Sequence, residues 1–210
     1  MRALIFANGM LDGQEKIPEL IRPDDLIIAA DGGANHCDAL GITPDILIGD
    51  MDSVRADVLK RLRAAGTEIV VHPARKDQTD LELALGLACE RGASEVIVLA
   101  ALGHRWDMSL ANISLLSAFE VPISFVDGPQ EITLIRGGRQ AEFHGKPGDI
   151  LSLIPVGGDA LGVTLEGLEY PLENDVLRFG ATRGISNVLR EKIVAVCLRQ
   201  GMLLCVRIRQ

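Results

Sequence analysis

The chain has 210 residues, 48% of them hydrophobic, which is enough for one large or two small domains with a substantial core. Its 29 acidic and 21 basic residues give a net charge of −8 at pH 7. This balance argues against a nucleic-acid backbone or an anionic membrane surface as the partner. Carboxylates gathered at one site would instead favour a metal cation.

The four cysteines point to a reducing compartment. Cys37, Cys89, Cys197 and Cys205 lie in apolar segments without Cys-x-x-Cys spacing, which is typical of reduced, buried thiols. No segment approaches the ~18 uninterrupted apolar residues of a membrane span, and the N-terminus enters a strand pattern without a signal peptide. We therefore expect a soluble, cytoplasmic protein that has no membrane partner.

The first 128 residues alternate short apolar runs with helical patterns. This alternation predicts a mostly parallel sheet that is covered by helices. The expected strands are residues 3–7, 26–30, 46–48, 68–71, 96–100 and 123–126, and the expected helices are residues 55–65, 81–91 and 109–119.

After residue 128 the pattern changes to short apolar runs broken by Gly and Pro, which is typical of an antiparallel sandwich or barrel. The fold class is therefore predicted to be α/β followed by all-β, with an α/β domain at residues 1–128 and an antiparallel β-sandwich at residues 129–210. The expected strands of the second domain are residues 132–136, 140–143, 150–154, 161–165, 193–198 and 202–208.

Two carboxylates follow the expected strand at residues 46–48. Asp50 and Asp52 are two positions apart, so extended backbone would place both on one face. A hard cation such as Mg2+ between them would relieve their mutual repulsion, and Gly49 would let the backbone turn closely beneath it. The alternative is that Asp52 and Ser53 cap a following helix.

Polar residues also follow two other expected strands. Asp31 precedes Gly32 and Gly33, and residues 103–107 contain Arg105 and Asp107. Open α/β sheets bind ligands at these carboxyl ends, and the two glycines could let backbone N–H groups approach a phosphate at a helix N-terminus. The alternatives are an ordinary turn at Asp31 and an exposed ion pair of little energetic value at residues 105–107.

The segment at residues 76–80 precedes the helix expected from Leu81. A helix N-terminus beside Arg75 and Lys76 suits phosphate, and Asp80 adds a third carboxylate for a metal. Thr79 or Asp77 could instead cap the helix, and capping is compatible with a ligand contact.

Five motifs together resemble the thiamine pyrophosphokinase family over nearly the whole chain. They are Asp31-Gly32-Gly33-Ala34, Gly49-Asp50-Met51-Asp52-Ser53, Lys76-Asp77-Gln78-Thr79-Asp80, residues 103–107 with Leu110-Ala111-Asn112, and Gly184-Ile185-Ser186-Asn187. The resemblance implies transfer of pyrophosphate from Mg-ATP to the hydroxyethyl group of thiamine, giving thiamine diphosphate and AMP. It also implies an ATP-binding α/β domain and a β-sandwich that binds thiamine and forms a homodimer, with active sites between subunits.

The resemblance also implies a role for each site residue. The implied Mg2+ ligands are Asp50, Asp52 and Asp80, and the implied triphosphate contacts are Asp31, Lys76, Thr79 and Arg105. Asp107 would lie near the acceptor hydroxyl, while Ser186 and Asn187 would face thiamine. Independently of the family, displacement at phosphorus needs charge neutralisation and in-line positioning, which a carboxylate-bound Mg2+ with Arg and Lys can provide.

Three functions remain open at the level of the sequence. The family usually has a second glycine where this chain has His104, and His or Gln where it has Met108. The favoured function is a thiamine pyrophosphokinase, because a carboxylate-rich site attracts the cationic thiazolium. The alternatives are a pyrophosphokinase for another hydroxymethyl heterocycle such as a pterin, and a regulatory module that binds Mg-ATP without turnover. The apolar strands at 193–198 and 202–208 end the chain and are expected to leave an exposed edge unless a partner covers it, which adds to the expectation of a dimer through the second domain.

Overall fold

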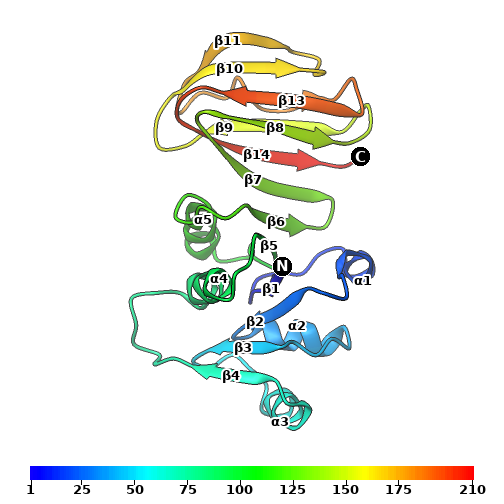
Figure 1. Ribbon diagram of the computed structural model, residues 1–210, viewed down its shortest axis with the longest axis vertical. Coiled ribbons are helices and arrows are strands. Elements are labelled where there is room, and N and C mark those ends of the chain that lie inside the picture. Colours follow the sequence, from blue (N-terminus) through cyan, green and yellow to red (C-terminus); the bar gives the residue numbers. More distant parts are fainter. The chain divides into compact units, whose positions relative to one another are not determined.

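The computed structural model describes all 210 residues, and the chain divides into two compact units, Met1–Gly128 and Pro129–Gln210. The first unit has alternating strands and helices, and the second consists of strands alone (Figure 1). This confirms the predicted α/β domain followed by an antiparallel all-β domain. No helix in the chain is long and apolar enough to cross a membrane.

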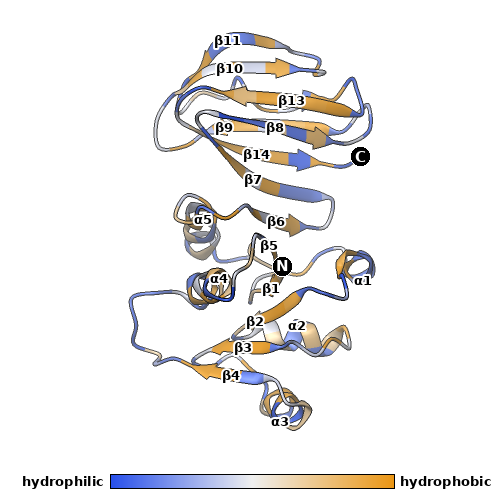
Figure 2. Ribbon diagram, in the orientation of Figure 1, coloured by the Kyte–Doolittle hydropathy of each residue, from blue (hydrophilic) through white to orange (hydrophobic).

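The first unit is built on parallel strands in the order β6-β5-β1-β2-β3-β4. All five residues of β1 are buried because β1 pairs in parallel with both β2 and β5, where Ile5 lies opposite Ile28 and Val98. The strands are almost uniformly apolar, as expected for a sheet that is covered on both faces (Figure 2). Their bounds are β1 (Arg2–Phe6), β2 (Leu26–Ala30), β3 (Ile46–Gly49), β4 (Glu68–Val71), β5 (Glu95–Leu99) and β6 (Ile123–Asp127).

Helices cover this sheet on both faces. Apolar side chains of α1, α2 and α3 pack in one core cluster with alternate strand residues such as Leu4 and Phe6, while α4 and α5 lie on the other side of the sheet (Figure 1). The helical elements are η1 (Gln14–Lys16), α1 (Ile17–Leu20), α2 (Gly33–Ala39), α3 (Ala56–Ala65), α4 (Asp80–Glu90) and α5 (Trp106–Leu115).

Helix α5 differs most from its expected range of 109–119. It begins at Trp106, directly after the extended residue Arg105, and ends at Leu115. The hydroxyl groups of Ser114 and Ser117 donate hydrogen bonds to the carbonyl groups of Leu110 and Ser114, respectively. Such side-chain bonds compete with helix propagation, which accounts for the earlier end.

The second unit contains two antiparallel sets of strands, in the orders β12-β9-β14-β7 and β11-β10-β13-β8. Their inward residues form one buried cluster that includes Leu153, Val163, Val196 and Leu203. The bounds are β7 (Gln130–Arg136), β8 (Arg139–His144), β9 (Ile150–Pro155), β10 (Ala160–Glu166), β11 (Leu172–Leu177), β12 (Asn187–Val188), β13 (Ile193–Leu198) and β14 (Met202–Ile208).

Two strands of the second unit were not predicted. Strand β11 has the polar sequence Leu-Glu-Asn-Asp-Val-Leu and buries only Leu177, and strand β12 has two residues. The expectation that β13 and β14 would lie at an exposed edge was wrong. Strand β14 lies between β7 and β9, and β13 lies between β8 and β10, so main-chain groups on both sides of each strand are paired.

Candidate active site

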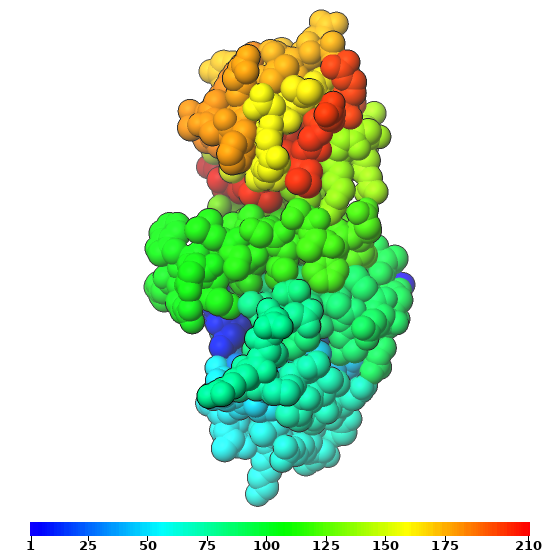
Figure 3. Space-filling model, turned by 90° about the vertical axis from the view of Figure 1, so that its left-hand side faces the viewer, coloured from blue at the N-terminus to red at the C-terminus, as the bar shows by residue number.

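A pocket of about 550 Å3 opens at the carboxyl ends of the parallel strands in the first unit. Figure 3 shows a hollow on this face, where the blue N-terminal segment is recessed between the cyan and green segments. The lining comes from the chain directly after β1, β2, β3 and β5 and from the first turns of α4 and α5. The pocket therefore lies where open α/β sheets bind ligands, at the carboxyl ends of the strands, as the sequence predicts.

Three carboxylates converge in this pocket. One oxygen from each of Asp31, Asp50 and Asp52 lies within 4.8 Å of the others. Asp31 is only 5% exposed, and burial raises its pKa although hydrogen bonds from Ser53 and Gly32 oppose the shift. Oxygen-rich clusters of this kind suit a hard divalent cation.

The loop at residues 50–53, which carries Asp50 and Asp52, does not cap helix α3. The helix begins at Ala56, its N-cap residue is Arg55, and no side chain accepts a capping hydrogen bond. Within the loop, Asp52 N donates to Asp50 Oδ1 at 3.1 Å, and Ser53 N donates to Asp31 Oδ1 at 3.4 Å. The capping alternative for Asp52 and Ser53 was therefore wrong.

Asp80 and Lys76 complete the charged end of the site. Lys76 Nζ lies 2.9 Å from Asp80 Oδ1 and 3.8 Å from Asp50 Oδ2. Burial opposes the charge of Lys76, but the carboxylates of Asp80, Asp50 and Asp31 outweigh it and raise the lysine pKa. Asp80 Oδ1 is buried and makes no hydrogen bond beyond this ion pair, so the donor set has room for a cation.

The backbone at the site is held in unusual conformations. Asp31, Met51 and Ala100 have φ values of 45°, 67° and 53°, and they lie just after β2, β3 and β5. Gly49 has a φ of 145°, and a Cβ there would lie 3.0 Å from both Asp31 Cβ and Asp80 Oδ1. Left-handed backbone is costly for side-chain-bearing residues and is often found at functional sites.

The two glycines after Asp31 have a packing role. A Cβ on Gly33 would lie 1.9 Å from Phe6 O, and one on Gly32 would lie 2.1 Å from Asn8 Oδ1. The glycines therefore allow α2 to approach the end of β1 closely. This explains their presence without a phosphate.

Thr79 is the N-cap of α4, and its Oγ accepts a hydrogen bond from Glu82 N at 3.2 Å. The capping interpretation of Thr79 is confirmed. Thr79 also lines the pocket, so one residue both begins the helix and faces the site.

We expect Thr79→Ala to lower the free energy of unfolding by about 1 kcal/mol, because the backbone N–H of Glu82 in the first turn of α4 loses its acceptor. Thr79→Ser keeps the hydroxyl acceptor and should retain most of the stability. Urea denaturation of both variants measures the difference. Equal losses in the two variants would contradict the capping role.

Arg105 and Asp107 form an exposed ion pair, with 2.5 Å between Nη2 and Oδ2. The hydrogen bond from Arg105 is the main reason that the pKa of Asp107 is lowered. Arg105, His104 and Met108 line the pocket, whereas the side chain of Asp107 lies outside its lining.

Ser186 and Asn187 lie in the second unit. Ser186 is exposed with a φ of 59°, and its N–H donates to Ser152 Oγ. Asn187 is buried, and its amide bonds the N–H and C=O of Tyr170 and the N–H of Val188. The Asn187 side chain thus ties together the backbone that presents Ser186.

Sequence reasoning overlooked the segment Asn8-Gly9-Met10, which also lines the pocket. The available signal was its position directly after the first strand. His36 Nε2 lies 2.9 Å from Gly9 O, and a Cβ on Gly9 would lie 2.2 Å from Leu102 O, so this segment is closely held. Asn112 was noted only as part of a motif, and its Nδ2 donates to Ala101 O at 2.7 Å.

A parallel α/β sheet with converging carboxylates, a lysine and an arginine at its carboxyl edge is typical of enzymes that handle a metal–nucleotide complex. The family model described as "Thiamin pyrophosphokinase, catalytic domain" matches residues 17–124, and that described as "Thiamin pyrophosphokinase, vitamin B1 binding domain" matches residues 140–203. The chain belongs to the thiamin pyrophosphokinase family.

Individual relatives agree with this assignment. The chain is 32% identical over 197 residues to thiamine pyrophosphokinase of Bacillus subtilis, covering 91% of this chain and 92% of the relative. The crystal structure of the Bacillus subtilis protein matches over 100% of both chains with a TM-score of 0.91 and 29% identity. The thiamin pyrophosphokinase structure from Geobacillus thermodenitrificans matches with a TM-score of 0.88 and 28% identity, over 100% of this chain and 98% of that one.

Proposed function

We propose that this chain transfers the pyrophosphoryl group of ATP to the hydroxyethyl group of thiamine, producing thiamine diphosphate and AMP. The observation that carries the proposal is the pocket in which Asp31, Asp50 and Asp52 converge beside Lys76 and Arg105. Membership of the thiamin pyrophosphokinase family supports the same reaction. In this proposal the first unit binds Mg-ATP, and the second binds thiamine and mediates dimerisation.

Asp50, Asp52 and Asp80 are the proposed Mg2+ ligands. Asp50 and Asp52 belong to the acidic cluster, and the buried Asp80 Oδ1, whose one partner is the Lys76 ammonium, supports adding the third carboxylate. Asp31 was expected to contact the triphosphate, but its oxygen lies in the acidic cluster, so we propose that it acts through the cation. Bound Mg2+ would supply neutralisation of the phosphate charge.

Lys76, Thr79 and Arg105 are the proposed contacts for the triphosphate. Lys76 Nζ lies close to the carboxylates of both Asp80 and Asp50. A divalent cation on those carboxylates would remove the need for the ammonium, leaving Lys76 available to phosphate oxygens. Thr79 lies at the N-terminus of α4, where backbone N–H groups also favour anions.

Asp107 is the proposed neighbour of the acceptor hydroxyl. Its ion pair with Arg105 lowers its pKa and makes it a weak base. This suits a displacement in which positioning and charge neutralisation dominate and the leaving group is already acidic. For the thiamine, we propose contact through Ser186, with Asn187 holding the backbone of that segment.

The reaction is tested by incubating the protein with Mg-ATP and either thiamine or a hydroxymethylpterin, and identifying the products. We expect thiamine diphosphate and AMP, with a thiamine KM that rises with salt because a cationic acceptor is drawn to an acidic site. Ser186→Ala should raise the KM for thiamine more than that for ATP. Formation of ADP, or faster turnover of the pterin, would contradict the proposal, and binding of Mg-ATP without turnover would favour a regulatory module.

We also propose a cytoplasmic homodimer that is formed through the second unit, with active sites between subunits. Large apolar side chains are exposed on that unit, namely Tyr170, Phe179 and Ile185. All four cysteines are free, which suits a reducing compartment.

Sedimentation at micromolar concentration should therefore give a dimer. Phe179→Asp should shift it toward monomer, because a charge would be buried at the contact. Glu173→Gln is the control, because it changes an exposed polar side chain of the same unit, and it should leave the assembly unchanged. A fully active monomer would refute the dimer.

A further inference from the structure

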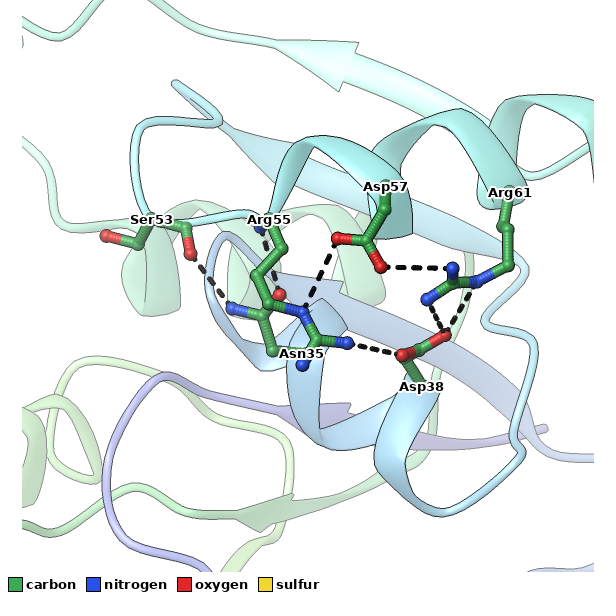
Figure 4. A network of polar contacts seen from close by, with 6 residues as sticks. All are labelled: Asn35, Asp38, Ser53, Arg55, Asp57 and Arg61. Carbon is green, nitrogen blue, oxygen red and sulfur yellow. Dashed lines mark hydrogen bonds and ion pairs between the residues drawn. The ribbon is translucent and has the colours of Figure 1, made fainter.

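We propose that Asn35 is a positioning residue that holds the loop bearing Asp50 and Asp52 in its metal-binding conformation. This inference rests on the proposed metal site. The Asn35 side chain reaches from α2 to the backbone of that loop at two points. Nδ2 donates to Ser53 O at 2.9 Å, and Arg55 N donates to Oδ1 at 3.0 Å (Figure 4).

The two contacts lie on either side of Val54, whose side chain is buried in the core of the first unit. Asn35 itself is fixed because its helix buries Ala34 and Cys37 completely. One amide therefore connects a rigid helix to the loop immediately after Asp52. Movement of Ser53 would break the contact and carry Asp52 with it.

The loop needs such a restraint because two forces oppose its conformation. Asp31, Asp50 and Asp52 repel one another within 4.8 Å, and Met51 has a left-handed φ of 67°. A bound cation would offset the repulsion, but the cation must first find the carboxylates close together. The hydrogen bonds of Asn35 keep them close before binding, and this lowers the cost of organising the site.

Only a neutral amide matches both contacts. Asn35 offers one donor and one acceptor to a backbone carbonyl and a backbone N–H that are close together. An aspartate there would still accept from Arg55 N, but it would place a second acceptor against Ser53 O. Asn35→Asp therefore breaks half of the contact with almost no change in volume.

The surrounding ion pairs supply a matched control. Asp38 lies on the same helix, and its carboxylate pairs with Arg55 Nη2 at 2.6 Å and Arg61 Nη2 at 2.7 Å (Figure 4). Its carboxylate bonds arginine side chains and not the backbone of residues 50–55, and both arginines are about half exposed. The Asp38 side chain is 23% exposed, and Asp38→Asn removes its charge from this network while both hydrogen bonds of the Asn35 amide stay in place.

The test measures binding of Mn2+ to the full chain without nucleotide, from the electron paramagnetic resonance signal of the free ion. Mn2+ is a suitable probe because it shares the oxygen ligands of Mg2+. We expect Asn35→Ala and Asn35→Asp each to weaken Mn2+ binding by about tenfold, and Asp38→Asn to change it less than about twofold. The amides of residues 52–55 should also exchange hydrogen faster in both Asn35 variants.

Asn35→Asp gives the sharpest result because electrostatics alone predicts the opposite sign. An added negative charge near the site would tighten cation binding, whereas a released loop weakens it. If Asn35→Ala does not fold, Asn35→Asp decides the question alone. Unchanged Mn2+ affinity in the Asn35 variants, with or without a lower melting temperature, would overturn the positioning role. Failure of the wild-type chain to bind Mn2+ would overturn the metal site itself.

Discussion

Asp52→Asn is expected to lower the rate of thiamine diphosphate formation by about 100- to 1,000-fold, the scale on which preorganised charge acts in catalysis. The melting temperature in metal-free buffer should be unchanged or higher. Asp52 is exposed, and its carboxylate accepts a hydrogen bond from the adjacent Ser53 Oγ at 2.8 Å. Little folding energy is therefore lost, while repulsion from Asp31 and Asp50 is relieved.

Asp57→Asn is the matched control for this variant. Asp57 is an exposed carboxylate on α3 that pairs with Arg61 at 3.0 Å and lies outside the pocket lining. Its removal should leave the rate within about twofold of the original, because a surface pair contributes little. Steady-state assays at saturating Mg2+ and melting curves in EDTA measure both effects. A marked drop in the metal-free melting temperature of Asp52→Asn would show that Asp52 acts structurally.

Gly33→Ala is expected to destabilise the chain by about 3 kcal/mol or more, a large part of the stability of an ordinary domain. The added Cβ would lie 1.9 Å from Phe6 O and 2.6 Å from Phe6 C. Phe6 belongs to the fully buried strand β1, so its backbone cannot move aside without disturbing the sheet. Urea denaturation should show a lower midpoint, and activity should fall because Asp31 lies two residues away.

Gly86→Ala makes the same chemical change with the opposite expected sign. Gly86 lies inside helix α4, and no atom would approach its added Cβ within 4 Å. Alanine favours the helix over glycine by about 0.5–1 kcal/mol, so this variant should be more stable than the original. Similar destabilisation of both variants would refute the close contact between Gly33 and β1.

Much of the fold followed from local pattern. Strands such as Leu26–Ala30 and Ile193–Leu198 have the predicted bounds because each is a short apolar run that ends at polar residues. Strand β11 was missed because it lies at the edge of its sheet and carries Glu173, Asn174 and Asp175, which give no apolar alternation. The pairing that makes it a strand comes from β10, which lies antiparallel beside it with Ala160 opposite Leu177 and Leu165 opposite Leu172.

The site was predictable only in part for a related reason. The strand-end rule brought Asp31, Asp50 and the Arg105 segment to one edge, since that rule depends on topology alone. It could not show that Asp31 turns toward Asp50 and Asp52. That arrangement depends on left-handed backbone at Asp31 and Met51, where no glycine indicates it in the sequence. Nor could it show that the side-chain amide of Asn187 bonds the backbone of Tyr170, a residue 17 positions earlier in the chain.

The left-handed residues Asp31, Met51 and Ala100 bear on how this protein would respond to engineering. They are the non-glycine residues of the first unit with positive φ, and all three follow strands that lead into the pocket. Glycine at position 51 or 100 would relax the backbone, so selection for heat resistance alone would be drawn to these positions. Glycine would relieve this strain in the folded chain, but it also has access to many more backbone conformations, so the loop bearing Asp50 and Asp52 and the backbone at residue 100 would be held less firmly. Thermostable variants recovered without a screen for turnover should therefore accumulate losses of activity at this edge.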